Sequence, residues 1–247
     1  MITNKEYFSK SNQSKYMSVS QYKSFCECES KALAELTGQY ERPSNDAMLF
    51  GSYVDAYFSN ELEQCKQHNP EVFKKSGELK SEFEKANIVI DRIERDPMFM
   101  QFMSGEKQVI KTGEIDGVEW KIKIDSYHPE RAIVDLKIMR DMEPIWKDGE
   151  KQHFIKAWGY EKQAAVYAAI EGNSLPFYLS VATKETEPDL KIIQIAQSVM
   201  DEALEEIKAR QGRFVAIKKG EETAEECGCC DWCKRNRILK EIELYEG

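Results

Sequence analysis

Residues 118–137, VEWKIKIDSYHPERAIVDLK, alternate apolar and polar side chains with a period of two and are interrupted once, at His128 and Pro129. This alternation is typical of strands with one buried face, and the interruption is typical of a turn. One side of the first predicted strand carries Trp120, Ile122 and Ile124, and the other carries Lys121, Lys123 and Asp125. The second strand likewise separates Ala132, Val134 and Leu136 from Ile133, Asp135 and Lys137. We therefore expect two carboxylates and a lysine on adjacent strands.

Asp135 and Lys137 form the D-x-K half of a known catalytic pattern, and Asp125 can supply the second acid. Asp125, Asp135 and the main-chain carbonyl of Leu136 would give an all-oxygen site suited to Mg²⁺ or Mn²⁺. Lys137 would then hold the attacking water or help to deprotonate it. The alternative is a plain hairpin with a solvated ion pair, because short motifs match many unrelated sequences.

Composition narrows the class of protein. A chain of 247 residues with 41% hydrophobic and 32% charged side chains is typical of a soluble globular protein with one large domain or two small ones. No apolar run is long enough to span a bilayer, and the first residues, MITNKEYFSKSN, lack the apolar core of a signal peptide. We therefore expect a cytoplasmic protein without membrane contact. The net charge of −9 means that any contact with DNA must come from a local basic surface.

Hydrophobic periodicity and turn residues predict the order of the elements. A first helix begins at Ser18 or Ser20 and ends at Gly38, and a second covers about 48–62. Two further helices cover 81–96 and a short stretch after Pro97. The remaining elements are strands over 107–111, 120–126 and 132–138, a helix over 159–171, strands over 175–184 and 190–196, and a helix over 198–211. This order predicts an α/β protein with an αβββαβ core that contains a three-stranded meander.

The connection over 139–158 is predicted as a long unstructured loop, which is uncommon inside a compact domain and is usually functional or disordered. Its basic residues can contact phosphates or can simply face solvent. These residues are Arg140, Lys147, Lys151 and Lys156. In the helix that follows, Tyr160, Gln163 and Tyr167 are three and four residues apart and share one face.

Together, the second helix, the strand pair and the GYEKQAAVY helix resemble the PD-(D/E)xK nuclease superfamily in its RecB-like branch, and within it the phage exonucleases similar to RecE. The resemblance runs from about residue 19 to residue 239. It implies a single nuclease domain over 1–247, with a restriction-endonuclease-like core and a central mixed sheet flanked by helices. The metal-binding aspartate of the family maps to Asp125, its D-x-K to Asp135 and Lys137, and its Q-x-x-x-Y to Gln163 and Tyr167.

The G-x-x-x-H helix of the family is matched by Gly51 to Asp55, so an aspartate stands where the branch usually has histidine. Asp55 offers a harder metal ligand than imidazole, and the exchange changes metal preference more than it removes metal binding. It also leaves open an alternative, a catalytically silent module for DNA binding or assembly on the same fold, although such a module would be expected to lose an acid or the lysine.

The resemblance implies an exonuclease that depends on Mg²⁺ or Mn²⁺ and hydrolyses linear DNA in phage-type recombination or end processing. The implied ligands of one or two ions are Asp55, Asp125, Asp135 and the Leu136 carbonyl. Gln163 and Tyr167 would brace Lys137 or position the DNA. The implied DNA contacts are Tyr160, Arg140, Lys147, Lys151 and Lys156. The implied partners are duplex DNA ends, a single-strand annealing protein and further copies of the chain, in the cytoplasm of a bacterial host.

Seven cysteines are unevenly placed, and C-x-x-C occurs twice between Cys227 and Cys233, where thiolates can converge on one ion. Some RecB-like nucleases join their termini through a [4Fe–4S] cluster held by one early and three late cysteines. The resemblance therefore implies the ligand set Cys28, Cys227, Cys230 and Cys233. Cys26 is less suitable, because two residues along a helix point to different faces. The alternatives are a Zn²⁺ ion, free thiols, or a zinc-binding interaction protein organised around this segment. A shared ion would pack residues 221–241 against the first helix.

Overall fold

The computed structural model describes residues 2–239, 241–242 and 244–245, and its centre is a five-stranded mixed sheet in the order β1-β2-β3-β6-β7. The strands are β1 (Glu106–Ile115), β2 (Val118–His128), β3 (Ala132–Met139), β6 (Phe177–Thr183) and β7 (Leu190–Gln194). The first three strands form an antiparallel meander, β3 pairs with β6 in parallel, and β7 returns antiparallel. The parallel pair requires a crossover, which contains helix α9 (Tyr160–Ile170). The predicted αβββαβ order is therefore confirmed.

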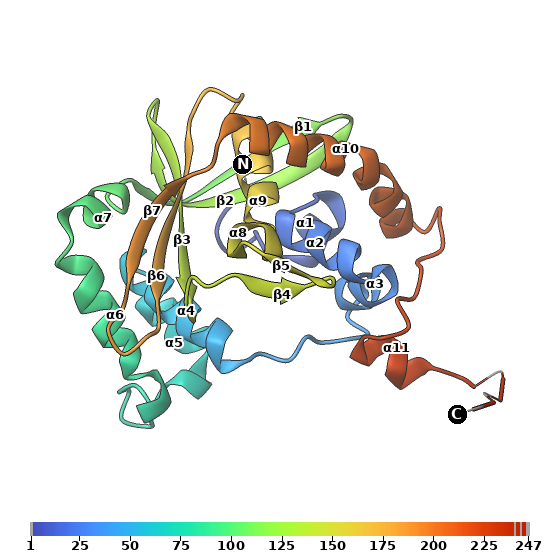
Figure 1. Cartoon of the computed structure of the whole chain (residues 1–247), viewed down its shortest axis with the longest axis horizontal. Coiled ribbons are helices and arrows are strands. Elements are labelled where there is room, and N and C mark those ends of the chain that lie inside the picture. Colours follow the sequence, from blue (N-terminus) through green and yellow to red (C-terminus); the bar gives the residue numbers. More distant parts are fainter. Residues whose placement is uncertain (1, 240, 243, 246–247) are drawn as a thin grey trace.

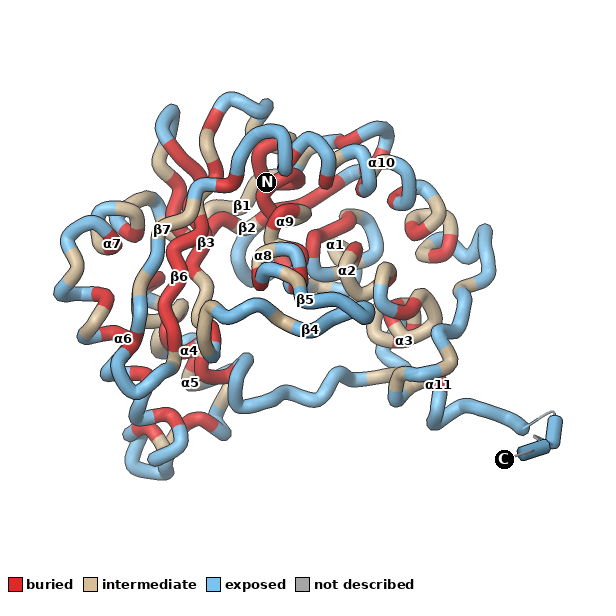
Figure 2. The backbone as a smooth tube through the Cα atoms, viewed as in Figure 1, coloured by how far each residue is buried: buried red, intermediate tan, exposed pale blue. Residues whose placement is uncertain are grey.

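Helices cover both faces of the sheet (Figure 1). One face packs against α2 (Val19–Glu27), α9 and α10 (Gln197–Lys219). The other face packs against α4 (Asp46–Phe58), α6 (Lys85–Glu94) and α7 (Pro97–Phe102). Neighbours on β3 divide between these two cores, because Ile133 belongs to the first and Val134 to the second. The central strands are consequently the most continuously buried part of the chain (Figure 2).

The alternation of β2 fixes the core on its side of the sheet. Trp120, Ile122 and Ile124 are fully buried, as the period of two predicts. The indole Nε1 of Trp120 donates to Gln211 Oε1 at 2.8 Å, and Gln211 Nε2 donates to the carbonyl of Ile115 at 2.8 Å. Helix α10 is therefore tied to the β1–β2 hairpin by a satisfied polar pair inside an apolar core.

The predicted helix over 18–38 is wrong in one respect, because two helices, α2 and α3 (Glu29–Thr37), take its place. Cys28 separates them with an extended backbone at φ −166° and ψ 111°. Its N–H still closes α2 on the carbonyl of Ser24, and its own carbonyl accepts the first bond of α3 from Ala32. One extended residue thus turns the chain without glycine or proline, which are the usual sequence markers of such a break.

The connection over 139–158 is also not the unstructured loop that was predicted. It contains a hairpin of β4 (Ile145–Lys147) and β5 (Glu150–Gln152), followed by the short helix α8 (Phe154–Ala157). Asp148 and Gly149 have φ of 53° and 81°, and Asp-Gly favours a two-residue hairpin turn. The sequence therefore contained the signal for this hairpin.

The remaining helices differ from prediction mainly at their ends. Helix α4 begins after Asn45, whose side chain accepts from Met48 N, and residues 62–68 form a separate α5 (Leu62–His68). The predicted helix over 81–96 splits into the 3-10 turn η2 (Ser81–Phe83) and α6. Helix α10 runs past the predicted residue 211 to Lys219, because Phe214 and Ile217 continue its buried stripe. Three short elements were not predicted, α1 (Lys10–Lys15), η1 (Pro70–Val72) and α11 (Asp231–Asn236).

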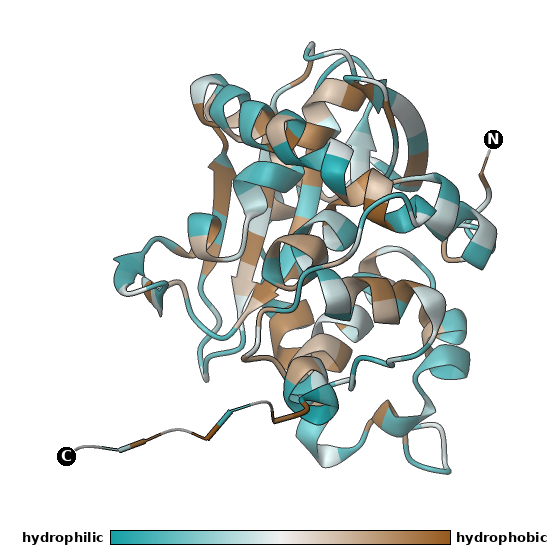
Figure 3. Ribbon diagram, turned by 90° about the vertical axis from the view of Figure 1, so that its right-hand side faces the viewer, coloured by the Kyte–Doolittle hydropathy of each residue, from teal (hydrophilic) through white to brown (hydrophobic). Residues whose placement is uncertain are grey.

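Hydropathy follows the layers, with hydrophobic segments on the strands and mixed colouring on the surface helices (Figure 3). Within the described part of the chain, no helix combines the length and apolar composition needed to cross a membrane.

Candidate active site

The two strand carboxylates lie where β2 and β3 run side by side. Asp125 precedes the paired residues Ser126 and Val134, and its Oδ2 accepts a hydrogen bond from the main-chain N–H of Leu136 at 2.9 Å. Asp135 is 2% exposed, and its Oδ1 accepts from the amide Nε2 of Gln163 at 2.5 Å. The ammonium of Lys137 forms an ion pair with the other oxygen of Asp135. The structure thus brings together the acids, the lysine and the glutamine that the sequence singled out.

Helix α9 connects the site to both strands. Gln163 contacts Asp135 on β3, and one helical turn later the hydroxyl of Tyr167 donates to the carbonyl of Lys123 on β2 at 2.8 Å. Burial raises the pKa of Tyr167 far above its usual value, so the phenol keeps the proton that it donates. The helix therefore holds the strand pair in register around the carboxylates.

Lys137 lies between the carboxylates and an aromatic ring. Its Nζ is 5.3 Å from the centroid of the Tyr160 ring. Burial alone would lower the pKa of Lys137, but the charges of Asp135 and Asp125 outweigh burial and hold that pKa above its ordinary value. The side chain is consequently an ammonium in this arrangement. It can orient a water or offset negative charge, but it lacks the free electron pair that a general base requires.

Asp55 approaches from α4, on the other face of the sheet. Its oxygens accept from Gln108 Nε2 at 3.3 and 3.4 Å, and from the hydroxyl of Ser59 at 3.4 Å. Burial, and then the negative charge of Asp135, raises the pKa of Asp55. Burial raises the pKa of Asp125 too, followed by the charges of Asp135 and Asp55. The three acids therefore repel one another as carboxylates.

A divalent cation fits this arrangement of acids. Asp135 Oδ2 is buried and receives no hydrogen bond within the described residues, although Lys137 lies against it. The mutual repulsion of these carboxylates and the free lone pair on Asp135 are both relieved by a hard cation with oxygen ligands. The aspartates are nevertheless more spread than the cysteines. Among the described residues, only a cysteine group gathers at least three ligand atoms within 4.8 Å of one another.

Three of the four basic residues predicted as phosphate contacts are engaged within the 139–158 segment. Arg140 pairs with Asp141 at 2.6 Å, and Lys156 lies 3.9 Å from Glu150. Lys147 Nζ donates to the carbonyl of Ala157 at 2.7 Å, which ties the β4–β5 hairpin to α8. The fourth residue, Lys151, is exposed on β5.

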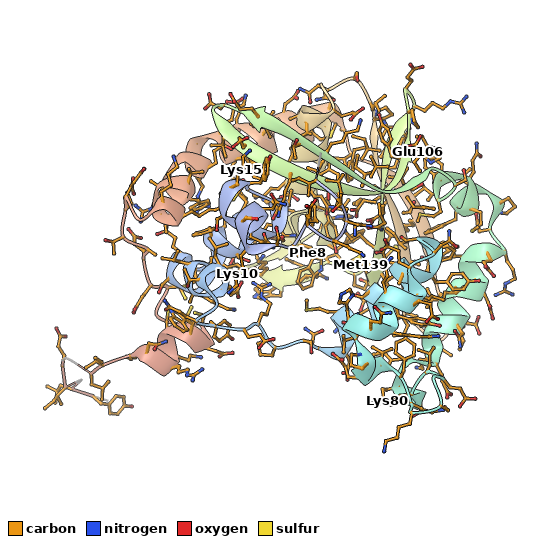
Figure 4. The ribbon with its side chains drawn as sticks, turned by 180° about the vertical axis from the view of Figure 1, so that it is seen from behind. Phe8, Lys10, Lys15, Lys80, Glu106 and Met139 are labelled. Carbon is orange, nitrogen blue, oxygen red and sulfur yellow. The ribbon has the colours of Figure 1, made fainter. Side chains whose placement is uncertain are left out.

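Sequence patterns missed three residues near the site. Tyr7 is 8% exposed, and burial, followed by the charge of Asp125, raises its pKa. Its neighbour Phe8 is exposed and lies toward the middle of the molecule seen from behind (Figure 4). Glu161 on α9 is 9% exposed, and its Oε2 has no hydrogen-bond partner within the described residues. Lys23 on α2 donates to the carbonyl of Trp158. None of these residues belongs to a spaced motif, so only the tertiary structure could bring them here.

The four predicted cysteines converge at the turn between α2 and α3. Cys28 Sγ lies 3.6 Å from Cys233 Sγ, and Cys227 Sγ lies 3.9 Å from Cys233 Sγ. Together with Cys230, all four sulfurs lie within 4.8 Å of one another. Cys26 is outside this group, as expected, although the chain turns at Cys28 instead of continuing one helix. Cys229 is exposed, and its sulfur lies 3.6 Å from that of Cys227.

Polar contacts surround the cysteine group. Ser30 N donates to the carbonyl of Glu225 at 3.0 Å, and Trp232 Nε1 donates to Ser30 Oγ at 3.0 Å. Arg213 on α10 forms a two-pronged pair with Glu29, with both distances at 2.7 Å. Residue 240, inside the predicted 221–241 segment, lies outside the described residues.

Comparison with known proteins agrees with this geometry. The family model described as "PDDEXK-like domain of unknown function (DUF3799)" matches residues 18–236. A protein from Eubacterium rectale, whose crystal structure is described as that of a "putative exonuclease", is 44% identical in sequence and gives a TM-score of 0.93. The match covers 99% of this chain and 96% of that one. No curated protein matches the chain.

Proposed function

Because the chain belongs to the PDDEXK-like family DUF3799, we propose that it is a metal-dependent deoxyribonuclease that hydrolyses phosphodiester bonds from the ends of linear DNA. One observation carries the proposal. Asp125 and Asp135 lie on adjacent strands, with the Lys137 ammonium against Asp135 and Gln163 holding its other oxygen. A silent relative would be expected to lose an acid or the lysine, and this chain keeps all three.

Each side chain has a separate task in this proposal. Asp125, Asp135, Asp55 and the Leu136 carbonyl would hold one or two Mg²⁺ or Mn²⁺ ions, which when bound acidify water and offset charge on the phosphate. Lys137, an ammonium beside these acids, orients the attacking water and stabilises negative charge as it develops. Gln163 keeps Asp135 in one rotamer, and Tyr167 fixes β2 through the Lys123 carbonyl.

The exonuclease assignment rests on the description of the Eubacterium rectale protein and on the RecE-like motifs. The expected setting is phage-type recombination or end processing in a bacterial cytoplasm. A single-strand annealing protein and further copies of the chain are the partners to test after DNA itself.

The decisive experiment is digestion of an end-labelled linear duplex, with the same DNA as a closed circle for control, in Mg²⁺, in Mn²⁺ and in EDTA. We expect the linear DNA to be degraded in either metal, and the circle and the EDTA samples to survive. Degradation of the circle would make the protein an endonuclease. Survival of all substrates under every condition would contradict the proposal.

For the cysteine group we propose one Zn²⁺ ion instead of the iron–sulfur cluster that the resemblance implied. Four thiolates around a single zinc ion at about 2.3 Å stand about 3.8 Å apart. The sulfur–sulfur separations of 3.6 Å between Cys28 and Cys233 and of 3.9 Å between Cys227 and Cys233 fit this value. In a [4Fe–4S] cluster each thiolate binds a different iron, so the sulfurs stand farther apart. The zinc would fasten the late segment to the turn between α2 and α3 within a single nuclease domain.

Metal analysis separates these assignments. Protein purified without oxygen should contain one zinc per chain and no acid-labile sulfide. Iron and sulfide in equal amounts would support the iron–sulfur cluster instead. Metal-free protein with alkylated thiols would contradict both the zinc and the cluster assignments.

A further inference from the structure

Lys23 and Trp158 meet beside the proposed catalytic lysine, although they come from distant parts of the chain. Lys23 lies on α2, and its Nζ donates to the main-chain carbonyl of Trp158 at 2.7 Å. The same Nζ is 5.6 Å from the centroid of the Tyr160 ring, and Lys137 Nζ is 5.3 Å from that centroid. The ring of Tyr160 therefore lies within about 6 Å of two ammonium groups.

The position of Lys23 is built into the start of α9. Gly159 caps this helix with φ of +63°, a conformation that L side chains rarely adopt. A Cβ at position 159 would lie 3.3 Å from Cδ of Lys23, so a side chain there would crowd the lysine stem. The glycine thus leaves the space through which Lys23 reaches the site.

Lys137 is paired with Asp135, but Lys23 has no acid within ion-pair distance among the described residues. The Trp158 carbonyl takes one of the three ammonium hydrogens of Lys23, and no other acceptor contacts that nitrogen among the described residues. Burial and the charge of Lys137 lower the pKa of Lys23 to about 8, despite the nearby Asp135 and Glu161. An anion beside Lys23 would accept its remaining hydrogens and balance its charge.

The residue whose carbonyl Lys23 contacts is a tryptophan with an exposed side chain. Trp158 is 51% exposed, which is unusual for so large a side chain, while its main chain is held by Lys23. Exposed aromatic rings next to phosphate-binding cations are the usual platform for unpaired bases, because every base can stack on them.

We propose that Lys23 and Trp158 form a subsite for one nucleotide of the cleaved strand, in which Lys23 binds the phosphate next to the scissile one and Trp158 stacks on its unpaired base. This inference rests on the proposed nuclease function. It specifies a substrate strand that is unpaired where it enters the site.

The test uses single-stranded oligonucleotides with one neutral methylphosphonate, or one abasic residue, moved stepwise along the strand. With the wild-type protein, each lesion should lower kcat/KM about tenfold at one position near the cleaved bond. Lys23→Met should lose the response to the methylphosphonate, and Trp158→Ala should lose the response to the abasic residue. In both variants KM should rise more than kcat falls on unmodified DNA.

Two matched controls test whether the loss of any lysine near a tyrosine ring, or of any exposed tryptophan, would give the same result. Lys31→Met removes a lysine whose Nζ also lies 5.6 Å from a tyrosine ring, that of Tyr40. Trp146→Ala removes a tryptophan on β4 that is 73% exposed. Both controls should keep the wild-type response to each lesion, with unchanged melting temperatures.

Binding is read in parallel by fluorescence anisotropy of the same oligonucleotides in Ca²⁺. If the wild type binds with this position dependence but cleaves no DNA, the subsite holds and the nuclease function fails. If Lys23→Met and Trp158→Ala keep the wild-type lesion profiles in cleavage and binding, the subsite is wrong and the nuclease function is untouched. Self-association that Trp158→Ala abolishes, with an unchanged abasic profile, would make Trp158 a contact between copies and would also overturn the subsite.

Discussion

The carboxylate site and the cysteine group are built in opposite ways. Asp125 and Asp135 are ten residues apart and meet because neighbouring strands pair, whereas Cys28 and Cys233 are 205 residues apart. The first site offers hard oxygen ligands next to an ammonium, and the second offers four soft thiolates. The comparison suggests two roles: the carboxylate site for catalysis and the cysteine group for stabilising the fold. We therefore expect changes in one site to alter rates and changes in the other to alter stability.

The largest effect is expected when the acids or the lysine of the carboxylate site are replaced. Asp125→Ala, Asp135→Ala and Lys137→Ala should each lower metal-dependent DNA degradation by about a thousandfold or more, because each removes a metal ligand or the charge beside the water. Circular dichroism should show that the variants remain folded. Asp91→Ala, an exposed acid on α6, is the control and should keep full activity. Wild-type rates in all three variants would refute the site.

Removal of the proposed metal cross-link at the cysteines should lower stability and leave activity unchanged. Cys230→Ser should lower the free energy of unfolding by on the order of 3 kcal/mol, because a metal cross-link over so long a loop restricts the unfolded chain. The folded fraction should keep its specific activity. Cys229→Ser, which changes an exposed cysteine outside the group, should leave urea denaturation unchanged. An unaltered melting temperature in Cys230→Ser would mean that the cysteines hold no metal.

Intermediate effects are expected for the helix that joins the two strands. Tyr167→Phe and Gln163→Ala should each reduce kcat about tenfold, since each loses one hydrogen bond that positions a strand or a carboxylate. Metal affinity, measured by calorimetry, should change little. Tyr57→Phe removes a comparable hydroxyl, which donates to Glu94, and serves as control. Unchanged turnover with a lower melting temperature would make Gln163 and Tyr167 packing residues only.

The smallest expected effect is on the pH dependence of stability. Burial, and then neighbouring acids, raises the folded-state pKa of Asp125 and of Asp55. The folded protein therefore binds more protons than the unfolded chain above the ordinary aspartate pKa, and stability without metal falls as the pH rises through this window. Melting temperatures in EDTA should decline from about pH 4 upward. Added Mg²⁺ should reduce the decline, and Asp125→Asn should flatten it. A profile that rises with pH and ignores Mg²⁺ would contradict this account.

The local periodicity of the sequence predicts much of the fold and of the carboxylate site. The alternation around Asp125 and Asp135 placed both acids on adjacent strands, and the helical spacing of Gln163 and Tyr167 placed both on one face. It could not give the break at Cys28, where tertiary contacts override a helical pattern. Lys23 was also out of reach, because its position depends on the left-handed Gly159 and on the Trp158 carbonyl. The β4–β5 hairpin is a different case, since the Asp148-Gly149 pair is itself a sequence signal for a two-residue turn.

The long separation along the chain between Cys28 and its three partner cysteines also affects the order of events during synthesis. The assigned aspartates, Lys137, Gln163 and Tyr167 all precede residue 168, and β6, which pairs with β3, ends at Thr183. Three of the four thiolates emerge from the ribosome only after residue 226. In a nascent chain, all residues of the carboxylate site can therefore be present before Cys28 has any of its three partner cysteines. Zinc capture would then be the last step of maturation, and the supply of that metal would decide how many new molecules persist.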